Sequence, residues 1–71
     1  MNLDELYRRE YGKILASLIR VVGDISLAED SLQDAFAAAH VQWPTKPPPN
    51  PVAWLILTAR HKAIDHLRRK T

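Results

Sequence analysis

The sequence predicts an all-α fold, a small bundle of three helices with a proline-rich loop between the second and the third. Apolar residues recur every three or four positions along about residues 3–22, 27–42 and 51–70, which places them on one face of each helix. Most of the prolines lie between the second and third stretches, where they prevent one helix from running into the next. A chain of 71 residues forms at most one domain, which we assign to residues 1–71.

The first helix is expected to begin at a capping box. Asn2 can cap free backbone N–H groups, and Glu5 lies three residues later, where its carboxylate can reach back to the cap. Gly23 can adopt the left-handed conformation that ends a helix. The residues expected on the buried face are Leu3, Leu6, Tyr7, Tyr11, Ile14, Leu15, Leu18 and Val22.

The second helix is expected to begin at a clearer capping box, Ser26 to Glu29, and to run to about Gln42. This segment contains no Lys or Arg, so its outer face is acidic. Such a face either pairs with a basic neighbour in the same bundle or serves a separate partner. The expected inward residues are Ala28, Leu32, Ala35, Phe36 and Ala39, and the expected outer ones are Glu29, Asp30, Gln33 and Asp34.

Trp43 and Pro44 should close that helix, because the residue before a proline is pushed out of helical geometry. The third helix should begin with Asn50 as its cap and Pro51 at its first helical position. Half of the ten Lys and Arg residues lie in the last dozen positions, which favours an anionic partner for this helix. Its expected buried stripe is Val52, Leu55, Ile56, Ala59, Ala63 and Leu67, and its expected exposed face is Trp54, Thr58, His61, Asp65 and Arg68.

The composition excludes several classes of protein. The absence of cysteine leaves neither a disulfide framework nor a thiolate metal site. The apolar runs are too short for a membrane span, and the N-terminus is charged from Asp4 onward, so we expect a cytoplasmic protein without a signal peptide. No nucleophile–base pair or phosphate loop indicates an enzyme. His61 and Asp65 have the spacing of metal ligands but no third ligand, so no metal or other cofactor is expected.

Two segments carry a resemblance to a known family. LAEDSLQDAFAAAHVQW and NPVAWLILTARHKAIDHLRRK resemble the second conserved region of bacterial RNA polymerase sigma factors, most closely the extracytoplasmic-function group. The AED-x-x-QD pattern, AWL, TAR and AID-x-LRR follow the family's order and spacing over essentially the whole chain. The WP-x-x-PPPNP loop is similar to that of a subgroup whose members carry extra domains after the sigma regions.

The resemblance implies a module of transcription initiation that binds the polymerase core and opens the −10 promoter element by capturing the non-template strand. The acidic helix would dock on the coiled-coil clamp helices of the β′ subunit. His61, Asp65 and the loop up to Asn50 would line a pocket for a flipped base. The implied polymerase-binding residues are Glu29, Asp30, Gln33 and Asp34, and the implied DNA-binding residues are Asn50, Thr58, Arg60, His61, Lys62, Asp65, Arg68 and Arg69.

The sequence also departs from the family. His61 stands where many relatives have Asn, and an imidazole cannot reproduce the paired donor and acceptor of an amide, so no base preference follows. His66 stands where many relatives have a basic residue. The family's second DNA-binding domain, for the −35 element, is absent, so we expect a fragment or an excised domain. A regulatory domain or an anti-sigma protein is a further expected partner.

Other interpretations remain open from the sequence. A helix-turn-helix protein that binds duplex DNA would also place a basic last helix on DNA, but it needs neither an acidic docking face nor a long proline loop. A protein-interaction module with an incidental basic patch is the third interpretation. Arg60 could pair with an acid of the second helix instead of DNA. Trp43 and Trp54 are expected to pin the loop to the bundle more than to stack on bases.

Overall fold

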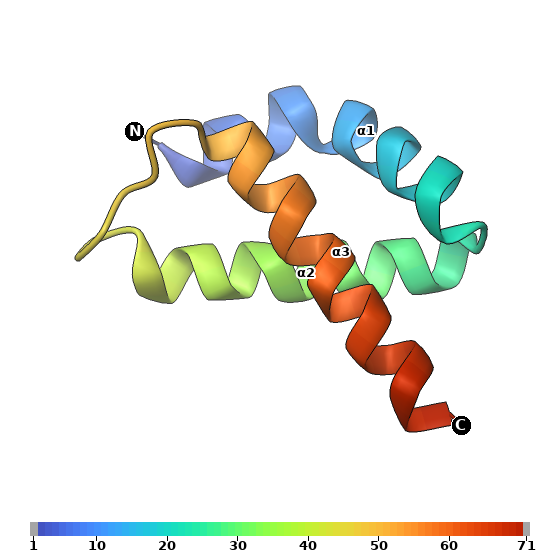
Figure 1. Ribbon diagram of the computed structural model, residues 1–71. Helices are drawn as coiled ribbons and strands as arrows, with labels where there is room; N and C mark the ends of the chain where they lie inside the picture. Colours follow the sequence, from blue (N-terminus) through green and yellow to red (C-terminus); the bar gives the residue numbers. More distant parts are fainter. Residues whose placement is uncertain (1, 71) are drawn as a thin grey trace.

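The structure is a computed structural model that describes residues 2–70, and for Lys70 the backbone alone. It contains the helices α1 (Leu3–Val22), α2 (Ile25–Gln42) and α3 (Pro51–Lys70), and the described residues form no strand. Figure 1 shows α1 and α2 running in opposite directions, while α3 crosses them diagonally and its C-terminal end extends past α2. Helix α3 packs more extensively on α2 than on α1. The predicted all-α three-helix fold is confirmed.

Asn2 caps α1 as the sequence predicted. Its Oδ1 accepts hydrogen bonds from the backbone N–H groups of Asp4 and Glu5, at 3.0 and 3.2 Å. The Glu5 carboxylate accepts from Arg9 at 3.2 Å, so it supports the first turn from its C-terminal side rather than closing a capping box. At the other end Gly23 has φ 76°, and its N–H donates to the carbonyl of Ile19 at 2.7 Å. The left-handed helix end is therefore confirmed.

The start predicted for α2 is wrong. The helix begins at Ile25, and its cap is Asp24, whose Oδ1 accepts from the backbone N–H of Leu27 at 3.0 Å. Asp24 has extended backbone geometry directly after the left-handed Gly23. Because that turn leaves Asp24 as the first residue able to cap, and Asp caps as well as Ser, the helix starts before Ser26. The predicted box of Ser26 and Glu29 instead lies inside the first turns of α2.

Replacing Asp24 with Ala is therefore expected to lower the free energy of unfolding by about 1 kcal/mol, the usual cost of a lost N-cap. Ser26→Ala should change it by less than about 0.5 kcal/mol, because Ser26 is exposed within the helix. Urea denaturation followed by circular dichroism measures both values. A larger loss for Ser26→Ala than for Asp24→Ala would restore the capping box at Ser26.

The third helix begins as predicted. Asn50 Oδ1 accepts from the backbone N–H of Ala53 at 3.1 Å, and its carbonyl accepts from Trp54 at 3.0 Å. Pro51 is the first helical residue. Trp43 and Trp54 meet edge to face with ring centroids 5.3 Å apart, so the two ends of the loop at 43–50 are held together. The expected packing role of the two tryptophans is confirmed.

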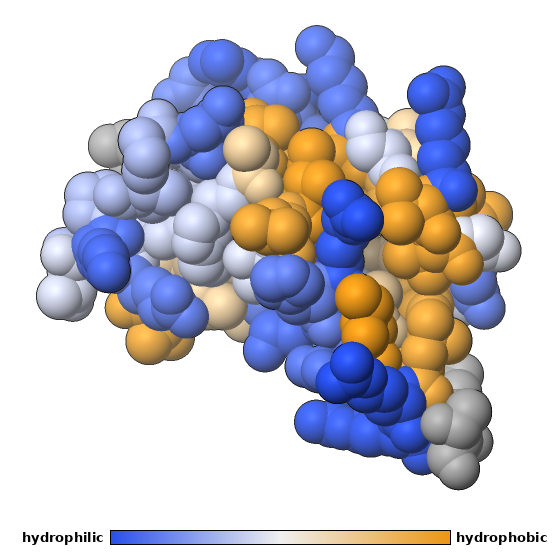
Figure 2. All heavy atoms as spheres, viewed as in Figure 1, coloured by the Kyte–Doolittle hydropathy of each residue, from blue (hydrophilic) through white to orange (hydrophobic). Residues whose placement is uncertain are grey.

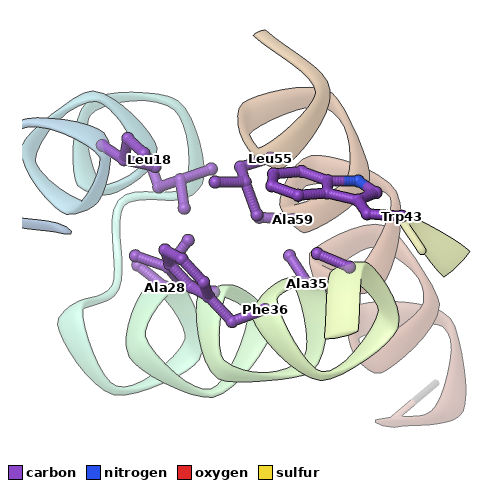
Figure 3. Close-up of a cluster of buried hydrophobic side chains, with 10 residues drawn as sticks. Leu18, Ala28, Ala35, Phe36, Trp43, Leu55 and Ala59 are labelled. Atoms are coloured by element: carbon purple, nitrogen blue, oxygen red, sulfur yellow. The ribbon is translucent and has the colours of Figure 1, made fainter. Parts of the chain in front are cut away.

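The core lies where the three helices meet, and small residues let α2 and α3 approach closely (Figure 3). Every inward residue predicted for α2 is buried. Ser31 is also fully buried, which the pattern of apolar residues did not predict. The central buried residues are Ile14, Leu18, Ala28, Leu32, Ala35, Phe36, Ala39, Trp43, Leu55 and Ala59.

Three predictions about the faces of α3 are wrong, and one of them concerns Thr58, which was expected on the exposed face but is half-buried. Leu67, expected in the buried stripe, is 49% exposed, because the end of α3 extends past α2 (Figure 1) and Leu67 lines only a shallow groove beside the end of α1. Trp54, expected on the exposed face, is half-buried and packs against the core. It lies in the first turn of α3, where it meets the Trp43 ring edge to face.

Candidate nucleic-acid interface

The acidic face of α2 is exposed, but its members differ in what they contact. Glu29 and Asp30 face solvent. Gln33 lies on the α1 side, where its Nε2 donates to the hydroxyls of Tyr7 and Tyr11 at 3.1 and 3.4 Å. Asp34 lies on the α3 side, with its Oδ2 at 3.1 Å from Nε2 of His66. The predicted acidic face is therefore present, although half of it already has partners within the bundle.

Most of the predicted DNA-binding residues of α3 form one strip. One turn of an α-helix takes about 3.6 residues, so residues three, four or seven positions apart lie on the same side of the helix. His61, Asp65 and Arg68 are exposed along this strip, and Thr58 and Lys62 are half-buried at its edge nearer the core. We call this set the polar strip of α3: Thr58, His61, Lys62, Asp65, Arg68 and Arg69.

Arg60 does not belong to the polar strip. It lines a shallow groove of about 120 Å³ between the end of α1 and α3, beside Val21, Val22 and Leu67. The alternative in which Arg60 pairs with an acid of α2 is not found, because no ion pair joins Arg60 to any acid among residues 2–70. In Figure 2 hydrophobic side chains gather along this part of the surface, and hydrophilic ones cover the left side of the projecting end of α3.

The N-terminal end of α3, where the polar strip begins, is held in place by contacts with the loop. The Asn50 side chain is occupied as the cap of α3, and the Trp43–Trp54 contact fixes the point where the loop enters the helix. Trp54 precedes Thr58 by one turn and begins the same side of the helix. Such a fixed helix start offers oriented backbone N–H groups and a positive dipole end beside a strip of polar side chains.

Sequence reasoning missed the intramolecular partners of this surface. The apolar pattern predicts Tyr7 and Tyr11 on the buried face of α1, yet Tyr7 is 37% exposed and both hydroxyls bond to Gln33. His66 was noted only as a departure, and it joins α3 to the acidic face. Among the described residues no three His, Asp or Glu side chains gather as a metal site, and no helix is long and apolar enough to cross a membrane.

The family model described as Sigma-70 region 2 matches residues 6–71. The chain belongs to the sigma-70 region 2 family. It is 30% identical over 69 residues to the ECF RNA polymerase sigma factor SigM of Bacillus subtilis (strain 168), covering 97% of this chain and 42% of that protein. It is also 40% identical over 58 residues to the uncharacterized protein R00370 of Rhizobium meliloti (strain 1021), covering 80% of this chain and 14% of that protein.

The resemblance to sigma factors of the extracytoplasmic-function group is thereby confirmed. No solved structure matches the chain. The chain spans less than half the length of either curated relative that it matches. The sigma region 2 family is a module of transcription factors and not of enzymes.

Proposed function

We propose that this sigma region 2 chain acts in transcription initiation, where it docks on RNA polymerase core and recognises and opens the −10 promoter element by capturing its non-template strand. The family match over residues 6–71 and the likeness to a named RNA polymerase sigma factor support the proposal. The observation that carries it is the polar strip of α3, which stays accessible beside a rigid loop while the helix's opposite side packs on the bundle.

On DNA, the polar strip performs two tasks. Lys62, Arg68 and Arg69 neutralise phosphates and release counterions, which holds a strand of any sequence. His61 and Asp65 receive a base that has left the stack, while the loop up to Asn50, about 16 Å from His61 along the helix axis, borders a neighbouring part of the strand. Removing a base from a duplex costs a few kcal/mol, and stacking and hydrogen bonds to its edge offset that cost. Arg60, on the other side of the helix, contributes to the positive field rather than to the pocket.

On polymerase, the acidic face of α2 binds the clamp helices of the β′ subunit. Glu29 and Asp30 are exposed, and Asp34 is half-exposed beside His66. Helix α2 contains no Lys or Arg, so a basic partner meets no like charge on this helix. The acidic face and the polar strip lie on different helices, and this arrangement lets one small domain bind polymerase and DNA at the same time.

The test is a binding assay that compares single-stranded with duplex −10-like DNA, with and without polymerase core. The proposal requires a preference for the non-template single strand in the presence of core. A preference for duplex DNA without any requirement for core would favour the helix-turn-helix interpretation. No salt-dependent binding to either form would favour the interaction module with an incidental basic patch.

Changing Lys62 and Arg69 to Ala is expected to weaken binding to all DNA sequences alike. The slope of log affinity against log salt should fall by about one unit for each lost phosphate contact. Fluorescence anisotropy at several salt concentrations measures the slope. Lys13→Ala with Arg20→Ala is the matched control, because it removes the same charge from exposed positions of α1. A loss confined to one DNA sequence would mean that Lys62 or Arg69 reads bases.

A further inference from the structure

A shallow hollow of about 320 Å³ lies between α1 and α2, next to the acidic face. Tyr7 of α1 and Gln33, Phe36 and Ala37 of α2 line it. Ala37 is exposed, so its small side chain leaves room over the helix. The hollow is distinct from the polar strip, because its lining includes no residue of α3.

Tyr7 is held in place in this hollow. Gln33 Nε2 donates to both tyrosine hydroxyls, the Tyr7 and Tyr11 ring centroids lie 4.7 Å apart, and Phe36 meets Tyr7 edge to face at 4.9 Å. Tyr7 is nevertheless 37% exposed. A large aromatic side chain that is fixed before binding and still reachable loses little entropy on association. Tyrosines of this kind are frequent among the residues that dominate the affinity of protein interfaces.

The charge around the hollow specifies the chemistry of the partner. Asp4 and His40 also lie in its lining. Asp30 precedes Gln33 by one helical turn on the exposed side of α2. No Lys or Arg lines the hollow, and α2 has none. An aromatic and apolar floor beside carboxylates complements a helix that presents one apolar side chain between Lys or Arg residues.

We propose that the polymerase-docking surface extends from the acids of α2 across this hollow to α1, with Tyr7 as its anchor. The proposal rests on the proposed function, since it assigns the partner of the hollow to the same clamp helices of the β′ subunit. A side chain of that partner fills the space over Ala37 and packs on the Tyr7 ring. Gln33 is a positioning residue, because its amide bonds hold the two tyrosine hydroxyls.

The decisive variant is Ala37→Arg, which fills the hollow and adds a cation that repels a basic partner. Ala37 is exposed within α2, so the helix tolerates the change. We expect affinity for polymerase core, measured by surface plasmon resonance with the 71-residue chain, to fall by about tenfold or more. Ala16→Arg is the matched control, since it makes the same change at an exposed alanine of α1 outside the hollow, and it should leave core affinity unchanged.

Tyr7 and Gln33 supply a second measurement. Tyr7→Ala should weaken core binding by about tenfold, while Tyr7→Phe keeps the ring and should retain most of it. Gln33→Leu should weaken core binding less than Tyr7→Ala and increase the mobility of the Tyr7 ring in NMR spectra, a change that the loss of a direct polymerase contact would not produce.

The outcomes separate this inference from the proposed function. If Asp30→Arg with Asp34→Arg loses core binding while Ala37→Arg and Tyr7→Ala keep it, the extension is wrong and docking through the acids stands. If all three retain core binding, the proposed docking itself is wrong. If the wild-type chain dimerises in sedimentation experiments and Ala37→Arg is monomeric with normal core affinity, the hollow is an interface between copies of this chain, which also overturns the inference.

Discussion

Replacing Asp30 and Asp34 together with arginine is expected to abolish binding to polymerase core. The double change turns two carboxylates into two cations on a helix that otherwise carries no Lys or Arg, so a basic partner meets repulsion in place of attraction. Folding should survive, because both residues are exposed. The bond of Asp34 to His66 joins two partly exposed side chains, and its loss costs at most about 1 kcal/mol. A pull-down with purified core, paired with circular dichroism, measures both properties.

His66→Ala is the control for the intramolecular bond. It releases Asp34 from α3 but leaves both acids in place, so core binding should be retained. If His66→Ala weakens core binding as much as the double charge reversal does, the effect comes from the junction between α2 and α3 and not from the acids. A normal circular dichroism spectrum together with normal core binding of the charge-reversed chain would show that polymerase docks elsewhere.

The features that were predicted well are local ones. The spacing of apolar residues within one helix determines which side is buried, and every inward residue of α2 follows it. The caps at Asn2 and Asn50 depend on backbone groups within three residues, so the chain around them suffices to predict them. The polar strip of α3 is likewise a property of one helix.

The prediction of where α2 begins was wrong for a reason that is also local. Asp24 and Ser26 both suit an N-cap, and their residue types do not decide between them. The left-handed turn at Gly23 decides, because it directs the chain so that Asp24 has extended geometry and the helix follows at once. The geometry of the preceding turn therefore outweighed the better match of Ser26 and Glu29 to a capping box.

The remaining differences depend on how the helices cross. Leu67 continues the apolar stripe of α3, but the bundle ends before it, and no pattern within α3 marks that point. The contacts of Gln33 with Tyr7 and of Asp34 with His66 join residues 26 and 32 positions apart. Sequence spacing within one helix cannot reveal such pairs. Arg60 is different, because helical spacing alone places it away from His61 and Asp65, and it was grouped with them for its charge.

Replacing His61 with Ala is expected to reduce affinity for single-stranded −10 DNA by about 1–3 kcal/mol, the usual cost of losing a side chain on which a base stacks. His61 is exposed on the polar strip, one turn before Asp65, and its side chain makes no hydrogen bond or ion pair with another residue between 2 and 70. The substitution should leave the fold intact, since Ala is a better helix former and no packing is lost. Affinity for duplex DNA should change much less, because it comes mainly from contacts of Lys and Arg with phosphates.

His40→Ala is the matched control for His61→Ala. It removes an exposed imidazole from α2, away from the polar strip, and should leave strand affinity unchanged. Both variants are compared with the wild type at one fixed salt concentration, because strand affinity falls steeply with salt. Equal affinity of wild type and His61→Ala for the single strand would mean that His61 only occupies a solvated face. Asp65 would then be the remaining candidate on the polar strip to hold the flipped base, and Asp65→Ala would test it. The loop up to Asn50 lies about 22 Å from Asp65 along the helix axis, so substitutions along residues 44–50 would test a separate contact with the strand.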